Sequence, residues 1–456
     1  MTTIEIDPLS KELGDRFQAA GHELYLVGGV VRDLVMGRLA PETDTDFATD
    51  ASPAETSRLL RGWAEVQYLV GVRFGTVGAR RHGRVVEITT YREERYPTDE
   101  RKPAVTFAKD IGTDLSRRDF TINAMAVRLP DGGFVDPFEG VKDLAAKRLD
   151  TPLEPEVSFS DDPLRMLRAA RFVAQLGVIP APRVIEAIAR MRDRLGIVSA
   201  ERIREELDKL LVAESPGAGL ALLVETGLAE EFLPELPALQ LEQDPVHRHK
   251  DVLRHTFAVV ERLEPDPVLR LAGLLHDIGK PSTREITPDG VSFHHHEVVG
   301  ARMAEQRLRE LRYPNSVVED VRKLVELHLR FHGFGEGWTD AAVRRYVRDA
   351  GPLLDKLDQL TRADCTTRDP KRAERFGRLQ DELEDRIARL AEQENIEAMR
   401  PPLDGRQVME RLGLEPGPLV GEALAFLMEI RMERGELPED EAYGLLEDWA
   451  KEHGIA

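Results

Sequence analysis

The sequence predicts an α+β fold, with a mixed sheet and helices in an N-terminal head and helices alone in the rest of the chain. Short β-branched runs bounded by glycine or charge occur in the first 150 residues, which is typical of strands. From Ser160 onward the apolar residues recur at helical spacing. A length of 456 residues allows three or four domains. We expect a head over residues 1–150, a neck over 151–240, a further helical domain over 245–394 and a C-terminal helical unit over 400–456.

Four runs in the head are predicted to be strands, at residues 24–27, 75–78, 85–90 and 134–136. Each is short, and a glycine or a charged residue marks its end. A helix is predicted to begin near Thr121 and to carry the apolar residues that follow it.

Residues 160–163 read Ser-Asp-Asp-Pro, and this order predicts the start of a helix. Serine and aspartate side chains accept from the free amides of a first turn, and proline fits there because no amide donor is needed. Further prolines divide the neck into short helices, and Pro401-Pro402 indicates a linker before the C-terminal unit.

The single cysteine, Cys365, excludes an intramolecular disulfide and favours a reducing compartment. No run approaches the roughly 20 apolar residues that a membrane helix needs. Residues 1–11 lack the pattern of a secretion signal. We therefore expect a cytoplasmic protein without a membrane partner.

The formal net charge of −20 argues against broad, nonspecific binding to nucleic acid. Arginines nevertheless gather at residues 80–84, 92–102, 117–118 and 165–204. An RNA partner therefore stays open if these clusters fold onto one face. The alternative is that they are solvated surface.

Two carboxylates two positions apart, Asp44 and Asp46, follow a glycine pair and a basic residue at Gly28, Gly29 and Arg32. Alternate residues of a strand point to one face, so both carboxylates can reach one site. Two oxygen ligands suit Mg²⁺, and glycine lets the backbone approach a triphosphate. The pattern predicts a site that transfers a nucleotidyl group.

Four motifs in the same order carry a wider resemblance. Residues 28–33 with 44–49, residues 114–126, residues 136–140 and residues 161–172 resemble the successive motifs of the class II CCA-adding tRNA nucleotidyltransferases, a family that also includes bacterial poly(A) polymerases. The resemblance implies a polymerase-beta-like nucleotidyltransferase head, with tRNA, CTP and ATP as partners and Mg²⁺ as cofactor. No protein partner is evident.

The resemblance assigns roles to residues of the head. Asp44 and Asp46 are expected to hold Mg²⁺ and to be catalytic, and the motifs also place the following residues at the nucleotide: Gly28, Gly29, Arg32, Arg117, Arg118, Asp119 and Asn123. Glu87 lies on a neighbouring predicted strand and is a candidate third catalytic carboxylate. An ordinary surface carboxylate is the equally open alternative for Glu87.

The last motif predicts how a base is chosen without a template. At about 100° per residue, Asp162, Arg165 and Arg168 fall within an arc of about 120° on one helix. An aspartate accepts from an exocyclic amine and an arginine donates to a ring acceptor, an edge that C and A share. Asp162 and Arg165 are therefore expected to read the base, with Arg168 and Arg171 at the phosphates or the pocket wall. Alternatively, Asp162 only marks the start of a helix and the arginines lie on the ordinary surface of that helix.

A second set of candidate ligands lies beyond Pro245. His276-Asp277 ends an apolar run, with His255 upstream and Asp364 downstream, an order that resembles the HD phosphohydrolase superfamily. His296 and His328 stand where two-metal members add ligands. Imidazole and carboxylate together suit a transition metal or Mg²⁺ that activates water against a phosphoester.

Several functions are consistent with these motifs. The leading hypothesis is addition or repair of the 3′-terminal CCA of tRNA from CTP and ATP, with phosphohydrolase activity of the HD domain as an addition. One alternative is a poly(A) polymerase or an enzyme that adds only CC or only A. Another is a metal phosphohydrolase whose head is a regulatory nucleotide-binding domain. A noncatalytic RNA-binding protein is the least favoured, since metal and pairing residues are present.

Overall fold

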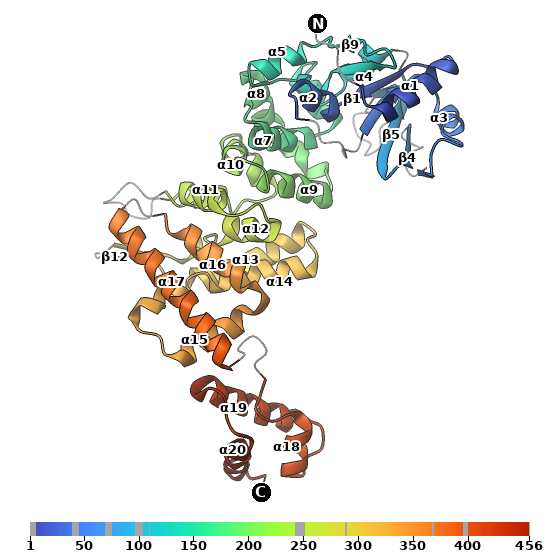
Figure 1. The fold of residues 1–456 in the computed structure, drawn as a ribbon. Coiled ribbons are helices and arrows are strands. Elements are labelled where there is room, and N and C mark those ends of the chain that lie inside the picture. The colour runs from blue at the N-terminus through green and yellow to red at the C-terminus, as the bar shows by residue number, and fades with distance from the viewer. Residues whose placement is uncertain are drawn as a thin grey trace. The chain divides into compact units, whose positions relative to one another are not determined.

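The computed structural model describes residues 6–38, 45–68, 75–95, 104–108, 110–241, 251–287, 290–366, 369–394 and 400–455. The chain divides into two compact units, Met1–Pro237 and Ala238–Ala456 (Figure 1). The first unit holds a sheet and the helices that follow it. The second unit is helical apart from one hairpin. The α+β fold with a helical remainder is therefore confirmed.

The head is built on a seven-stranded sheet with the order β3-β4-β5-β2-β1-β8-β9. Its strands are β1 (Leu24–Val27), β2 (Thr45–Thr49), β3 (Val66–Tyr68), β4 (Thr76–Arg81), β5 (Arg84–Thr90), β8 (Ala126–Leu129) and β9 (Phe134–Val135). β2 and β5 run parallel, and the other described neighbours are antiparallel. Strands are thus present at all four places where the sequence predicts them.

The two faces of the sheet are covered differently. Helix α1 (Pro8–Ala19), which Asp7 caps, buries Leu13 and Phe17 against one face. Phe47, Val77 and Val86 are buried in the same core. The other face carries a smaller core that includes Tyr25 and Ala48. Part of this second face holds exposed polar side chains, and the candidate site lies there.

The prediction of a helix that begins near Thr121 is wrong. Thr121–Asn123 forms one 3₁₀ turn, and the chain enters strand β8 at Ala126. The whole run from 121 to 127 is buried, so its apolar residues have no period that separates helix from strand. The segment from Ala126 is a strand because it pairs with β1, with Leu24 opposite Leu129 and Leu26 opposite Val127.

The neck consists of α6 (Pro155–Asp161), α7 (Leu164–Leu176), α8 (Pro182–Met191), α9 (Ala200–Leu211) and α10 (Pro216–Glu225). The helix start predicted at 160–163 needs correction. Ser160 and Asp161 end α6, and Asp162 is extended between the two helices. Pro163 explains the break, because the residue before a proline is disfavoured in the helical region.

The second unit contains a bundle and a smaller C-terminal group of helices. The bundle has α11 (Val252–Arg262), α12 (Pro267–Leu275), α13 (His296–Glu310), α14 (Asn315–Leu327), α15 (Asp340–Ala350), α16 (Leu354–Asp364) and α17 (Pro370–Glu394), with the hairpin β12 (Arg284–Thr287) and β13 (Gly290–Phe293). The C-terminal group has α18 (Gly405–Leu412), α19 (Pro418–Arg434) and α20 (Glu439–Glu452), around a core with Val408, Leu427 and Leu446.

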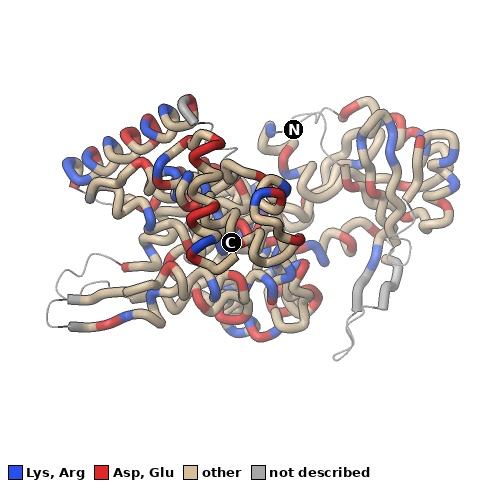
Figure 2. Tube along the Cα trace, turned by 90° about the horizontal axis from the view of Figure 1, so that it is seen from below, with Lys and Arg blue, Asp and Glu red and all other residues tan. Residues whose placement is uncertain are grey.

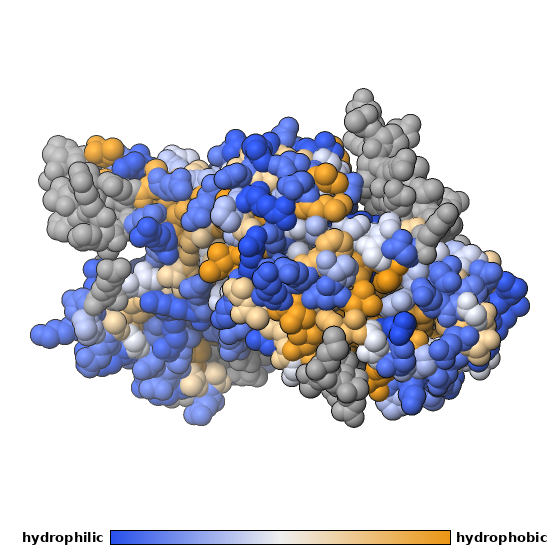
Figure 3. All heavy atoms as spheres, turned by 90° about the horizontal axis from the view of Figure 1, so that it is seen from above, coloured by the Kyte–Doolittle hydropathy of each residue, from blue (hydrophilic) through white to orange (hydrophobic). Residues whose placement is uncertain are grey.

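Charged and polar residues are common on the parts of the surface that the figures show. Figure 2 shows Lys and Arg interspersed with Asp and Glu along many helices of both units. Figure 3 shows a mainly hydrophilic face in which apolar residues gather in smaller patches. None of the described helices is long and apolar enough to cross a membrane.

Candidate nucleotide site and candidate metal centre

Two of the predicted catalytic carboxylates lie side by side on the sheet. Asp46 of β2 pairs in parallel register with Glu87 of β5, and both side chains are exposed. Their strand neighbours Phe47 and Ile88 are buried on the opposite face, so Asp46 and Glu87 share the open face. Asp44 lies outside the described residues.

Gly28 lies beside Asp46 of this carboxylate pair. Its φ of 77° lies in the region that favours glycine. A Cβ built there would lie 3.1 Å from Arg118 Nη1 and 3.8 Å from Asp46 Oδ2. Gly28, Arg118 and Asp46 are therefore brought together, as the sequence predicts for one site. Gly29 opens α2 (Gly29–Val35) next to them.

A chain of buried and partly buried hydrogen bonds joins four predicted nucleotide residues. Arg32 Nη1 donates to Asn123 Oδ1 at 2.9 Å, and Asn123 Nδ2 donates to Asp119 Oδ1 at 3.0 Å. Arg168 Nε donates to Asp119 Oδ2 at 2.9 Å. Burial raises the pKa of Asp119, but the charge of Arg168 and the bond from Asn123 outweigh it and lower the pKa to about 2. Asp119 is thus an anion that orients its neighbours.

Phe172 and Glu206 complete this network from the neck. The guanidinium carbons of Arg32, Arg168 and Arg171 lie 5.6, 5.6 and 4.3 Å from the centre of the Phe172 ring. Arg171 Nε lies 2.6 Å from Glu206 Oε2. Glu206 is buried on α9 and was not predicted. No signal in the sequence distinguishes Glu206 from the other carboxylates of α9, because its burial becomes visible only in the structure.

Arg117 and Arg118 share a second buried carboxylate. Arg117 Nη2 lies 2.8 Å from Asp114 Oδ1, and Arg118 Nη2 lies 3.3 Å from Asp114 Oδ2. Burial raises the pKa of Asp114, and the charges of Arg118 and Arg117 outweigh this and hold the pKa below its usual value. Asp114 therefore holds both guanidinium groups, and it fixes that of Arg118 beside Gly28.

The two residues expected to read a base are bound to other protein groups in this structure. Asp162 precedes α7 instead of lying on it, so the predicted arc on one helix is wrong for this residue. Asp162 Oδ2 lies 2.7 Å from Arg202 Nη2. Arg165 is buried and donates to Ser158 Oγ at 2.9 Å and to the carbonyl of Arg117 at 2.5 Å.

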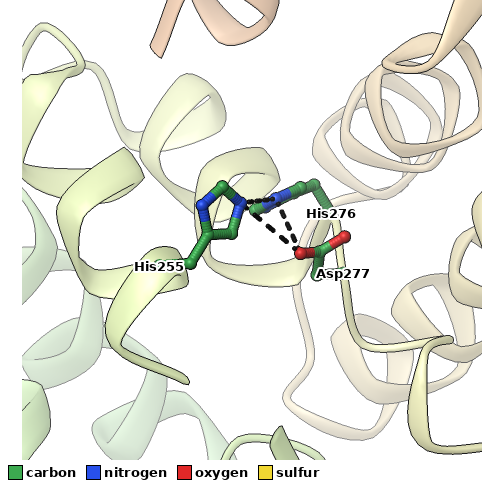
Figure 4. A group of neighbouring side chains, drawn as sticks. All are labelled: His255, His276 and Asp277. Atoms are coloured by element: carbon green, nitrogen blue, oxygen red, sulfur yellow. Dashed lines mark hydrogen bonds and ion pairs between the residues drawn. The ribbon is translucent and has the colours of Figure 1, made fainter. Parts of the chain in front are cut away.

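In the second unit, the predicted metal ligands form one cluster. Side-chain atoms of His255, His276 and Asp277 lie within 4.8 Å of one another (Figure 4). Those of Asp277, His296 and His328 also lie within 4.8 Å of one another. Asp277 belongs to both groups. Asp364 joins the first group, because its Oδ1 lies 2.9 Å from His255 Nε2 and 3.5 Å from His276 Nε2.

Backbone hydrogen bonds fix which nitrogen each imidazole offers. Nδ1 of His276, His296 and His328 is bonded to the carbonyl oxygen three residues earlier, at 2.8, 2.8 and 2.6 Å. If Nδ1 donates there, Nε2 is the basic nitrogen and points into the cluster. Nε2 of His296 and of His328 is buried without a hydrogen-bond partner. This donor set fits a metal ion, which would take up those lone pairs.

The charges of the cluster differ from ligand to ligand. Burial lowers the pKa of His276, but Asp277 and Asp364 outweigh it and raise the pKa to about 10, so a metal ion at this ring would displace a proton. Burial lowers the pKa of His328 to about 3, so the ring is neutral and able to bind metal. Burial raises the pKa of Asp277, but His276 and Lys280 outweigh it and hold this pKa well below its usual value. Lys280 Nζ lies 2.7 Å from Asp277 Oδ2 and was not predicted. His332 Nε2 lies 3.9 Å from Asp364 Oδ2 at the edge.

Three family models match successive parts of the chain. They are described as the poly A polymerase head domain, over residues 24–150, a probable RNA and SrmB-binding site of polymerase A, over 177–239, and the HD domain, over 252–392.

Known relatives match nearly the whole chain. An A-adding tRNA nucleotidyltransferase of Deinococcus radiodurans is 35% identical over 442 residues, which are 94% of this chain and 95% of that protein. A CC-adding tRNA nucleotidyltransferase of Thermus thermophilus is 34% identical over 443 residues, 94% of each chain. A CCA-adding enzyme of Anoxybacillus flavithermus is 32% identical over 344 residues, 75% of each chain.

Among solved structures, the Bacillus stearothermophilus CCA-adding enzyme in complex with CTP is similar, with a TM-score of 0.69 and 26% identity over 98% of this chain and 99% of that one. The predicted resemblance is confirmed. The chain belongs to the tRNA nucleotidyltransferase family, which includes these A-adding, CC-adding and CCA-adding enzymes.

Proposed function

We propose that this chain adds or repairs the 3′-terminal CCA of tRNA, using CTP and ATP without a nucleic-acid template. The observation that carries the proposal is the exposed carboxylate pair, Asp46 and Glu87, beside Gly28 and Arg118 on the open face of the sheet. Near full-length similarity to enzymes that add A or CC supports the substrate. We also place the protein in the cytoplasm, which its single cysteine favours.

In the proposed reaction, the 3′ hydroxyl of tRNA attacks the α-phosphorus of the nucleoside triphosphate. A new phosphorus–oxygen bond forms, the bond to the β-phosphate oxygen breaks, and pyrophosphate leaves. Asp44 and Asp46 would hold Mg²⁺, with Glu87 as a third carboxylate, and the ion would neutralise phosphate charge and favour the ionised hydroxyl. Gly28 gives the triphosphate access to the backbone, and Arg118 offers it a positive charge.

The arginine network has a separate proposed task. Arg32, Asn123, Asp119 and Arg168 hold one another through buried hydrogen bonds, so their positions are set before a substrate arrives. Preorganised charge of this kind stabilises a developing phosphate charge without rearrangement. We propose that Arg117, Arg118 and this network contact the sugar and phosphates of the nucleotide. Arg171, which Glu206 holds, would form the outer wall of the nucleotide pocket.

For base selection we retain Asp162 and Arg165. Asp162 would accept a hydrogen bond from the amino group of C or A, and Arg165 would donate to the ring acceptor beside it. U and G present a different edge and are expected to be rejected. Because Arg202 and Ser158 occupy these two side chains here, nucleotide binding must exchange those partners.

An assay of incorporation tests the proposal. Purified protein with Mg²⁺ is given tRNAs that end before CCA, after the first C and after CC, with CTP, ATP or both, and product lengths are read on a gel. Full CCA is expected only with both nucleotides. Addition of CC alone, of A alone or of a long A tail would replace CCA addition with the corresponding alternative. Asp46→Asn should abolish transfer, and Asp131→Asn, an exposed carboxylate elsewhere in the head, should not.

A second candidate function belongs to the HD cluster. The unpartnered Nε2 atoms of His296 and His328, together with the shared Asp277, favour a metal-dependent phosphohydrolase as an added activity. Hydrolysis of bis-p-nitrophenyl phosphate with Mn²⁺ tests it. Loss of hydrolysis in Asp277→Ala with transfer retained supports two separate activities. Absence of hydrolysis in the unmodified protein would remove this candidate.

A further inference from the structure

An aromatic side chain lies in the same row of the sheet as the catalytic carboxylates. In the register of the strands, Tyr68 of β3 pairs with Gly78 of β4, Gly78 pairs with Glu87 of β5, and Glu87 pairs with Asp46 of β2. Directly paired residues of neighbouring strands project to the same face. Tyr68 therefore stands on the open face, at the edge of the sheet, in line with Glu87 and Asp46.

Glycine at the second position of the row lets the tyrosine lean over it. A Cβ built on Gly78 would lie 3.3 Å from Tyr68 Cβ and 3.5 Å from Tyr68 Cδ2. With no side chain at Gly78, the ring has room directly above the strand. Tyr68 is nevertheless 41% exposed, which is unusual for a ring of this size. One side of the ring rests on the sheet, and the rest faces solvent.

The surroundings of Tyr68 on this face favour a nucleic acid over an apolar partner. Arg80 pairs with Val66 in the same register, so it projects from the same face, and it is exposed. Val66 is 37% exposed and adds apolar area beside the ring. An exposed aromatic ring with a neighbouring arginine is the arrangement that binds single-stranded RNA, through base stacking and phosphate charge.

We propose that Tyr68 is a stacking platform for a base at the 3′ end of the RNA primer, with Arg80 near its phosphate. The inference rests on the proposed function, in which a 3′ hydroxyl must reach the carboxylates. β3 and β5 are two strand spacings apart, so Tyr68 and Glu87 are separated by about 10 Å. One or two nucleotides span such a distance. A base on Tyr68 would therefore place the terminal hydroxyl toward Glu87 and Asp46.

Steady-state kinetics with tRNA ending in CC and with ATP test the proposal. Tyr68→Ala should raise KM for tRNA about tenfold, since stacking on an aromatic ring is lost, and should leave KM for ATP within about twofold. Tyr68→Phe, which keeps the ring, should restore KM for tRNA. An unchanged KM for tRNA in Tyr68→Ala, or a rise confined to ATP, would overturn the proposal.

Gly78→Ala provides a matched control. The new methyl group presses on Tyr68 and does not touch the carboxylates, so KM for tRNA should rise in the native background. The same change in a Tyr68→Ala background should have no further effect. An equal rise in both backgrounds would show that the sheet, and not the ring, is responsible, and would overturn the proposal.

A binding measurement separates this inference from the proposed reaction. A tRNA with 2-aminopurine as its 3′-terminal base loses fluorescence when that base stacks on an aromatic ring. Quenching is expected with the native protein and with Tyr68→Phe, and not with Tyr68→Ala. This readout needs no catalysis, so quenching without incorporation would contradict only the proposed function. Incorporation with quenching that survives in Tyr68→Ala would contradict only the stacking site.

Discussion

Arg202 Nη2 lies 2.7 Å from Asp162 Oδ2, so the aspartate proposed to read a base is held by a guanidinium from α9. Asp162 itself precedes α7, in the extended residue before Pro163. The ion pair occupies Oδ2, and the amide of Leu164 donates to the other oxygen, Oδ1, at 3.2 Å. A base that uses Asp162 must therefore displace one of these two donors.

Arg202→Ala is expected to change nucleotide affinity but not nucleotide choice. The side chain of Arg202 is 51% exposed, so its ion pair is worth at most about 1 kcal/mol, and KM for CTP and ATP should change by no more than about fivefold. Asp162→Ala should instead lose the rejection of UTP and GTP. Steady-state rates with all four nucleotides measure both effects, with Arg190→Ala as an exposed control in the same neck. Equal acceptance of UTP by both variants would contradict this division of roles.

The HD cluster is predicted to hold two metal ions that share Asp277. His296→Ala and His328→Ala each remove a ligand of one group only, so each should keep one ion, whereas Asp277→Ala should lose both. Metal content per chain after reconstitution with Mn²⁺ and dialysis gives the count. His295→Ala is the control, because that side chain is 84% exposed and lies in neither group. Two ions retained by His296→Ala would contradict the assignment.

Much of the fold could be predicted because its signals are local. The strand predicted at 24–27 ends before a glycine, as expected. The helix start predicted at 160–163 was wrong, although the sterics of the residue before Pro163 account for the break that the structure has there. The prediction of a helix that begins near Thr121 was wrong for a physical reason. A segment that is buried on all sides shows no period, and only its pairing with β1 makes it a strand.

The candidate sites show the same limit. Strand alternation predicted a common face for Asp44 and Asp46, and the ligand order of the histidines indicated their cluster. Glu87 was only a candidate on a neighbouring strand, and its alignment with Asp46 depends on the register of β2 and β5. Glu206 and Arg202 could not be found in this way, because their partners Arg171 and Asp162 lie on another element. Which side chains meet there depends on how α9 packs on α7, and no spacing in the sequence determines that.

Asp119 is predicted to stabilise the first unit at neutral pH and to lose this contribution in acid. Its pKa is about 2 in the folded state against 3.8 in a free side chain, so its contribution is complete above about pH 4 and is lost as pH falls through 2. The shift corresponds to about 2 kcal/mol. Asp119→Asn should therefore be less stable than the native protein at pH 7, and this difference should shrink between pH 4 and pH 2.

Denaturant unfolding at pH 7, 4 and 3 measures this difference. Asp131→Asn is the control, since Asp131 forms an ion pair with Arg128 in which both side chains are 51% exposed, and such pairs contribute little. A stability difference for Asp119→Asn that stays constant down to pH 3 would assign the loss to altered packing and not to the charge of Asp119.

Asp358 is predicted to have the opposite pH dependence. Burial and a hydrogen bond with Glu384 raise its pKa to about 6, against 3.8 in a free side chain. Because the folded pKa is the higher one, the contribution of Asp358 is complete below about pH 4 and is lost as pH rises through 6. Glu384 and Asp381 of α17 compete with Asp358 for a single guanidinium, that of Arg362.

Asp358→Asn, which keeps a neutral group at all pH values, should therefore be more stable than the native protein at pH 8 by on the order of 1 kcal/mol and equal to it at pH 4. Hydrogen exchange of α16 and α17 at the two pH values localises the effect to this contact. Asp355→Asn, an exposed change on the same helix, should leave exchange unaltered at both. A native protein that gains protection in α16 between pH 4 and pH 8 would contradict the raised pKa, since the ionised pair of carboxylates would then stabilise the contact.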